Sequence, residues 1–383
     1  MKKFTFAAVL GSFTCIVHAQ SSLALYGVAD AGFIYNSNSK GHSLYTAGAG
    51  NLQGNRWGLR GTEDIGGGLK AIFVLENGFN MYTGGLAQGG DLFGRQAYVG
   101  ISSEYGSLTM GRQYDSVVDF TGPFEVGTQW ATYFGAHPGD LDNMNNTNRI
   151  NNSIKYTSVN YAGLKFGALY SFGGVAGQFN RNQIFSGGVG YSNGPLAVGV
   201  AYLNVRNPNV SLYGNMAVSS ATASNMGGST VIAGYATAGS EQVVAAGGSY
   251  TLGLATFGGT YSNTQFRSLG QTAVVATGQV ISGTAKFHNV EVSLKYQITP
   301  TWLVGVAYDY TLGYGVNGAR YHQAVVGTDY FLSKRTDLYF DCVYQHASGT
   351  DSTGHMAVAN INALSASSTA NQVATIVGLR VKF

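Results

Sequence analysis

Charged residues are scarce in this chain: Asp, Glu, Lys and Arg together make up 10% of its 383 residues. A soluble domain usually carries about 25%, so much of the surface must face something other than water. Long apolar runs are also missing after the first twenty positions, whereas a membrane-spanning helix needs about 20 such residues in succession. These two absences exclude an ordinary soluble enzyme and a helical membrane protein, and they favour a membrane β-barrel.

Cysteine and metal-ligand patterns are equally sparse. The chain has two cysteines, and Cys342 is the only one beyond the N-terminal segment, so no intrachain disulfide is expected there. The seven histidines are scattered without metal-ligand spacing. The formal net charge is only +3. We therefore expect no metal, no cofactor and no nucleic-acid partner.

The first nineteen residues have the pattern of a secretory signal peptide. Lys2 and Lys3 precede an apolar stretch from Phe4 to Val17, and the segment ends with a small residue at Ala19. We expect cleavage after Ala19. The chain then divides into a signal peptide, residues 1–19, and a barrel, residues 20–383.

What the sequence does contain is a repeated unit of about ten alternating residues followed by a turn, which is typical of barrel strands. In the last unit, apolar residues occupy every second position from Val377 to Phe383, and Arg380 and Lys382 fall between them. One face suits lipid and the other suits water. The same alternation predicts that Asp30 and Glu76 face the lumen.

Seven tight connections predict sixteen strands. Seven inner turns join fourteen strands in pairs, and the first and last strands complete the count. Two longer connections, 206–240 and 347–370, are expected to be exposed outer loops. The tight connections are 63–68, 102–106, 158–163, 191–195, 251–254, 297–301 and 331–336.

Charge is segregated along the chain. The connection 115–148 contains five acids and no Lys or Arg, whereas the neighbouring strands are basic. If this loop folds into the barrel, its acids would face a basic wall across a narrow waterway and orient passing solutes. An acidic loop that is merely solvated is the alternative. The predicted loop acids are Asp115, Asp119, Glu125, Asp140 and Asp142. The predicted basic wall is Arg56, Arg60, Lys70, Arg112, Arg149 and Lys155.

Several motifs resemble the general porins of Gram-negative outer membranes, of the betaproteobacterial and neisserial type. They are Asn55-Arg-Trp-Gly-Leu-Arg-Gly, Gly111-Arg-Gln-Tyr, Asn151-Asn-Ser-Ile-Lys-Tyr, Ser333-Lys-Arg-Thr-Asp-Leu-Tyr and the ending Val377-Gly-Leu-Arg-Val-Lys-Phe. The resemblance covers essentially the whole mature chain.

The resemblance implies a homotrimer of sixteen-stranded antiparallel barrels with short periplasmic turns, each narrowed by an inward-folded third outer loop. It also implies lipid and lipopolysaccharide contact, and a terminal Phe383 that the barrel-assembly machinery recognises. Its pore arginines correspond here to Arg56, Arg60, Arg112 and Lys155. Strict alternation places Arg112 with the lipid-facing residues, so either a bulge redirects it or it lies outside the pore. The third loop also departs from the enteric Pro-Glu-Phe-Gly-Gly, because Pro123-Phe-Glu-Val-Gly127 carries its acid one position later.

Catalytic alternatives have weak support. Gly190-Tyr-Ser-Asn-Gly194 matches the nucleophile elbow but ends at a turn, and Gly313-Tyr-Gly-Val-Asn-Gly318 lacks a following helix pattern. A sugar-specific channel would need aromatics facing the lumen, and a structural barrel would not need an acidic internal loop. The sequence therefore predicts no enzyme but a passive outer-membrane channel for small hydrophilic solutes and ions. Because lumen bases outnumber lumen acids, we expect weak anion preference.

Overall fold

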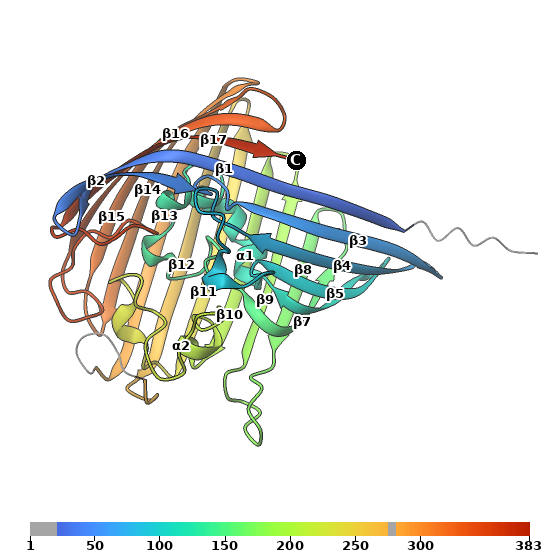
Figure 1. Cartoon of the computed structure of the whole chain (residues 1–383), viewed down its shortest axis with the longest axis horizontal. Helices are drawn as coiled ribbons and strands as arrows, with labels where there is room; N and C mark the ends of the chain where they lie inside the picture. The colour runs from blue at the N-terminus through green and yellow to red at the C-terminus, as the bar shows by residue number, and fades with distance from the viewer. Residues whose placement is uncertain (1–20, 275–280) are drawn as a thin grey trace, which may run out of the picture.

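The computed structural model describes residues 21–274 and 281–383, so the predicted signal peptide lies outside the described residues. One antiparallel sheet closes on itself, and short helices lie inside it or at its rim (Figure 1). Within the described residues, no helix is both long and apolar enough to span a membrane. The strands and α-helices are β1 (Ser22–Ser39), β2 (His42–Ala49), β3 (Arg56–Gly66), β4 (Leu69–Gly78), β5 (Gln96–Ser103), β6 (Gly106–Gln113), β7 (Ile150–Ser158), β8 (Leu164–Ser171), β9 (Ile184–Asn193), β10 (Leu196–Arg206), β11 (Ser240–Leu252), β12 (Ala255–Leu269), β13 (Gly283–Thr299), β14 (Trp302–Gly315), β15 (Arg320–Phe331), β16 (Thr336–Ser348), β17 (Asn371–Lys382), α1 (Ser116–Phe120) and α2 (Pro208–Ser211).

The seventeen strand segments make sixteen barrel strands. Both β2 and β3 pair with β1, so they are the two halves of one interrupted strand. The sheet closes where β1 pairs with β17, from Val28 opposite Lys382 to Asn36 opposite Ala374. Closure leaves no open sheet edge, which a spanning sheet requires. The predicted sixteen-stranded barrel is confirmed, and each of the seven predicted tight connections joins a hairpin.

The break between β2 and β3 bends inward and is held by one carboxylate. Asp30 on β1 accepts hydrogen bonds from the backbone N–H groups of Asn51, Leu52 and Gln53 at 2.9–3.2 Å. The Tyr339 hydroxyl donates to the same carboxylate at 2.6 Å. Asp30 does face inward, as alternation predicts, but it is fully buried because it satisfies backbone groups that leave the ladder.

The two faces of the sheet alternate as the sequence predicts. On β14, Val306 and Tyr308 are exposed on the outer face, whereas Leu303 and Asp309 are buried on the inner face. This arrangement repeats on β13, β15 and β16. The outer face is therefore apolar and aromatic, and the inner face carries the polar residues.

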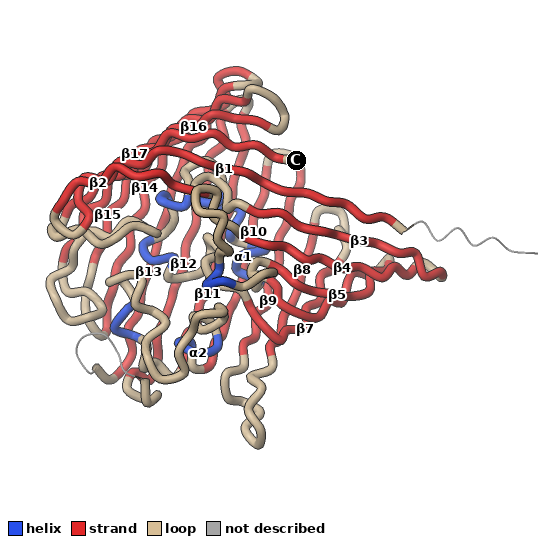
Figure 2. Tube along the Cα trace, in the orientation of Figure 1, coloured by secondary structure: helices blue, strands red, loops and turns tan. Residues whose placement is uncertain are grey.

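Three of the outer loops pack at least partly inside the barrel or against its rim. The third loop, residues 114–149, folds into the barrel together with α1 (Figures 1 and 2). Leu212 and Tyr235 in connection 206–240 and Ile361 in connection 347–370 are almost completely buried. The expectation that these two connections are exposed holds only in part: Val218 and Met356 are more than 80% exposed, whereas other apolar residues of both connections share a core with the third loop and the strands.

Glycines on the inner face of the wall receive the third loop. Phe124 packs against Gly247, and Trp130 packs against Gly305 and Gly327. A β-carbon at Gly305 would lie 2.5 Å from a carbon of the indole ring, closer than van der Waals contact permits. The Trp130 side chain is only 2% exposed. The loop can lie flat on the wall only because these positions lack side chains.

Gly305→Ala should therefore disturb the packing of the third loop against the barrel wall. Overpacking of this kind costs about 1–3 kcal/mol, so we expect a lower unfolding temperature in detergent and a shifted Trp130 fluorescence spectrum. Gly318→Ala is the matched control, because a β-carbon there has its nearest neighbour at 3.9 Å. Equal unfolding temperatures for the two variants would contradict the packing argument.

Candidate constriction of the lumen

A cavity of about 580 Å³ lies inside the barrel between the third loop and the inward break of β2–β3. Tyr133 of the loop joins the two, because its backbone N–H donates to the Asn51 carbonyl at 2.9 Å and its hydroxyl donates to the Asn51 side chain at 3.0 Å. Asn362 of the last loop also lines the cavity. Three segments distant in sequence thus narrow the lumen at one level.

Three arginines line this cavity: Arg56, Arg95 and Arg149. Arg95 forms a buried ion pair with Glu76, with Nε 2.8 Å from Oε1. Tyr114 also donates to Glu76 at 3.1 Å. One carboxylate therefore faces three guanidinium groups, and the surplus positive charge lies at the cavity wall.

Arg149 is the least compensated of the three. Its Nη1 donates to the Thr147 carbonyl at 2.8 Å, its guanidinium lies 5.9 Å from the centre of the Tyr114 ring, and its Nε has no hydrogen-bond partner among the described residues. Burial, together with the Arg95 charge, lowers the pKa of Arg149 to about 9. The side chain is still a cation at neutral pH.

The other predicted bases lie elsewhere. Arg60 is exposed and lies over the Tyr26 ring at 5.4 Å, four residues further along β3 than Arg56. Lys70 is the second residue of β4, beside the tight turn. Alternation alone predicts which face a residue occupies but not its height in the barrel, so neither residue lines the cavity described above.

Arg112 and Lys155 connect their strands to neighbouring loops through hydrogen bonds and ion pairs. The β6–β7 pairing shifts register between Gly111 and Gln113, so a bulge is present as one alternative requires. The bulge does not bring Arg112 into the described cavity: its Nε donates to the Gly94 carbonyl at 2.8 Å and its guanidinium lies 3.7 Å from Asp91. Lys155 forms an ion pair with Asp119 of α1 and donates to the Tyr114 carbonyl at 2.9 Å.

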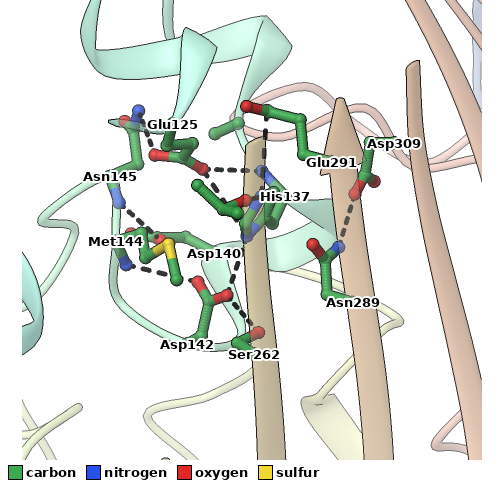
Figure 3. A network of polar contacts seen from close by, with 12 residues as sticks. Glu125, His137, Asp140, Asp142, Met144, Asn145, Ser262, Asn289, Glu291 and Asp309 are labelled. Carbon is green, nitrogen blue, oxygen red and sulfur yellow. Dashed lines mark hydrogen bonds and ion pairs between the residues drawn. The ribbon is translucent and has the colours of Figure 1, made fainter. Parts of the chain in front are cut away.

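The remaining loop acids do not face the arginines. Asp115 caps α1 by accepting from the N–H groups of Val117 and Val118. Asp142 accepts from Ser262 of β12, and Glu125 lies beside His137, which faces Glu291 of β13 (Figure 3). Asp140 accepts from the backbone N–H groups of Asn145 and Thr147 within the loop. All four are at most 1% exposed. The predicted opposition of acids and bases across water is wrong for them, because an irregular buried loop needs its carboxylates as hydrogen-bond acceptors.

His137 lies at the centre of these acids. Its Nδ1 is 2.7 Å from Asp142 and its Nε2 is 3.8 Å from Glu291 of β13 (Figure 3). Glu125 accepts from the His137 backbone N–H at 2.9 Å, and Glu291 accepts from the Val126 N–H at 3.0 Å. This network anchors the loop to the wall.

The pKa values in the loop follow from this arrangement. Burial disfavours the imidazolium, but Asp142 and Glu125 raise the pKa of His137 well above its usual value. Burial would likewise raise the pKa of Asp142, but His137 and Ser262 hold it below the usual range. Burial and the neighbouring Asp142 raise the pKa of Asp140 to about 7. His137 and Asp142 are therefore an ion pair at neutral pH, whereas Asp140 retains a proton in part of the molecules.

The fold and this site together define a transmembrane barrel narrowed by an internal loop, which is a channel. The family model described as Gram-negative porin matches residues 6–350, and the chain belongs to that family. It is an outer-membrane diffusion channel and not an enzyme.

The similar proteins agree with this assignment. An outer membrane porin of Bordetella pertussis is 39% identical over 52% of this chain and 59% of that protein. Outer membrane porin protein 32 of Delftia acidovorans is 29% identical over 88% of each chain. The solved anion-selective porin from Comamonas acidovorans has a TM-score of 0.71 at 22% identity, and it covers 95% of this chain and 100% of that one.

Sequence reasoning missed Arg95 and His137. Strict alternation would place Arg95 on the outer face with Val99 and Ile101. Arg95 lies before the first residue of β5, and alternation does not apply outside the strand. His137 is the only histidine in the acidic connection, and this isolated base among acids was an available signal.

Asp140→Asn and Asp142→Asn should differ in how their cost in stability depends on pH, because the pKa of Asp140 is raised and that of Asp142 is lowered. The folded protein favours the protonated form of Asp140, whose pKa is about 7, whereas the pKa of this side chain in the unfolded chain is about 4. The fold therefore loses stability as the pH rises from about 4 to about 7. Asp140→Asn should therefore cost less at pH 8 than at pH 5. Asp142→Asn breaks a buried ion pair, so it should cost about 3–5 kcal/mol at pH 7.

Thermal unfolding of the refolded variants in detergent between pH 5 and pH 8 measures both effects. The wild-type protein and Asp64→Asn, at the exposed end of β3, serve as references. Equal losses for the two loop variants at pH 7 would contradict the assigned protonation states.

Proposed function

We propose that this porin prefers small anions over cations. The observation that carries the proposal is the cavity wall, which Arg56, Arg95 and Arg149 line with Glu76 as the single paired carboxylate. The Comamonas porin, whose printed description is anion-selective, supports the same preference. Among the described residues, Glu125, Asp140 and Asp142 form no ion pair with the three arginines, because they accept hydrogen bonds from other groups.

The selectivity follows from local electrostatics. A unit charge about 6 Å from a passing ion in water contributes about 0.7 kcal/mol, which changes the local ion concentration roughly three-fold. Three arginines against one carboxylate favour anions, and salt screening keeps the preference weak. No bond to the solute is needed, so hydrophilic solutes pass by diffusion.

We also propose that three copies assemble, that the outer face contacts outer-membrane lipids including lipopolysaccharide, and that the barrel-assembly machinery recognises Phe383. A solved porin-like barrel of Vibrio cholerae is described as a trimer form, at 15% identity and a TM-score of 0.63. The Phe383 backbone exchanges two 3.0 Å hydrogen bonds with Gly27, and its side chain is 51% exposed. The terminal ring is therefore accessible while its backbone helps to close the barrel.

Arg149→Ala should shift ion selectivity toward cations. We expect a roughly two- to three-fold fall in the anion-to-cation permeability ratio, because one cavity charge is removed. Reversal potentials in planar bilayers under a salt gradient measure this ratio. The refolded wild type should conduct in steps of three if it is a trimer.

Two matched variants test the origin of the shift. Arg149→Lys keeps the charge and should retain wild-type selectivity. Arg181→Ala removes the same charge from an exposed outer loop and should change little. Unchanged selectivity in Arg149→Ala would refute the role of the arginine cluster, and open channels that exclude small ions would refute general diffusion.

A further inference from the structure

Three of the seven histidines lie on the outer face of the barrel, two at one level and the third close to it. His322 on β15 pairs in register with Tyr310 on β14 and with His346 on β16. His288 on β13 lies one cross-strand level further toward the outer loops. Neighbours on both sides in each strand are buried in the lumen, so these imidazoles belong to the outward-facing set.

The level of this row is fixed by the strands. Trp302, Tyr330 and Leu338 form the corresponding row near the periplasmic turns, and each lies eight residues from the histidine level on its own strand. Eight residues span about 26 Å along a strand, or about 20 Å across the membrane at the usual barrel tilt. The outward residues between the two rows are largely apolar or aromatic. The histidines therefore lie where the apolar band ends and lipid head groups begin.

Tyrosines orient the rings. The Tyr261 hydroxyl is 2.8 Å from Nδ1 of His288, and the Tyr308 hydroxyl is 2.6 Å from Nδ1 of His322. A phenol that donates to Nδ1 fixes the neutral tautomer with a proton on Nε2. That N–H is then available to an acceptor outside the barrel.

Basic side chains complete the surface. Lys286 precedes His288 on the same face and lies 5.7 Å from the Tyr314 ring, and Arg320 precedes His322 on the same face. Neither forms an ion pair within the part of the chain that the structure describes. The acids of β13–β16 all have the opposite parity and are buried on the inner side: Glu291, Asp309, Asp329, Asp337 and Asp341. The outer rim is thus a surface of hydrogen-bond donors and cations without carboxylates.

We propose that this surface, His288, His322, Lys286 and Arg320, binds the phosphate groups of a phosphorylated lipid in the outer leaflet. Phosphate oxygens accept the imidazole and guanidinium protons, and acyl chains lie on the apolar band below. Its height at the end of that band, and the absence of acids from its face in the described strands, select an anionic lipid rather than a soluble protein. The proposal deepens the lipid contact proposed above and is independent of ion selectivity.

Lipid binding to the folded, full-length barrel in detergent tests this directly. The probe is a bisphosphorylated glycolipid, followed by native mass spectrometry, and its dephosphorylated form is the reference. Lys286→Gln/Arg320→Gln should weaken binding of the phosphorylated form roughly ten- to thirty-fold. His288→Phe/His322→Phe keeps the aromatic packing and should produce a smaller loss. Neither variant should change binding of the dephosphorylated form.

Lys334→Gln/Arg335→Gln is the matched control, because it removes one Lys and one Arg at the opposite, periplasmic end of the same wall. Equal loss in this control would overturn the proposal, as would equal loss with the dephosphorylated lipid, which would show only general lipid contact. Tight binding of free inorganic phosphate would overturn the lipid assignment. Dissociation of oligomers in the rim variants would assign the surface to a second copy of the chain instead.

Discussion

Carboxylates that accept hydrogen bonds from irregular backbone hold the interior of this barrel in shape. Asp30 binds the inward break of β2–β3, and Asp115, Glu125, Asp140 and Glu291 each accept from backbone N–H groups of the third loop. An empty sixteen-stranded barrel is wide, and the segments that narrow it cannot satisfy their own N–H groups as strands do. Without these acceptors the narrowing segments would have unpaired polar groups in a buried position.

This use of the acids explains the electrostatics of the cavity. The third loop contains five of the eighteen acids in the chain, yet the cavity wall is dominated by arginines. Carboxylates that cap backbone are turned away from the water and are partly neutralised by His137 or by a bound proton. The acids of the loop are occupied with backbone hydrogen bonds, so the arginines determine the charge that passing solutes meet.

The regular part of the fold could be predicted from the sequence, and the irregular part could not. Alternation is a local property, so the last strand and all seven tight turns were found from short windows of residues. The break at 50–55 depends on Asp30 and Tyr339, which lie far away in the sequence. The direction of each acid in the third loop also depends on such distant partners. For Arg60 and Lys70 the missing information was height, because a period of two gives the face of a strand and not the level at which the lumen is narrow.

The seam between β1 and β17 has a consequence for how the chain is made. The edge of β1 that closes the barrel pairs with β17, and Gly27 pairs with Phe383, the residue that follows β17. Partners 356 positions apart cannot meet until the whole chain is available. Until β17 has been made, this edge of β1 lacks its closing partner, and an unpaired strand edge favours aggregation. A chain that lacks β17 cannot close the ring, and the backbone groups of β1 from Val28 to Asn36 lose their partners.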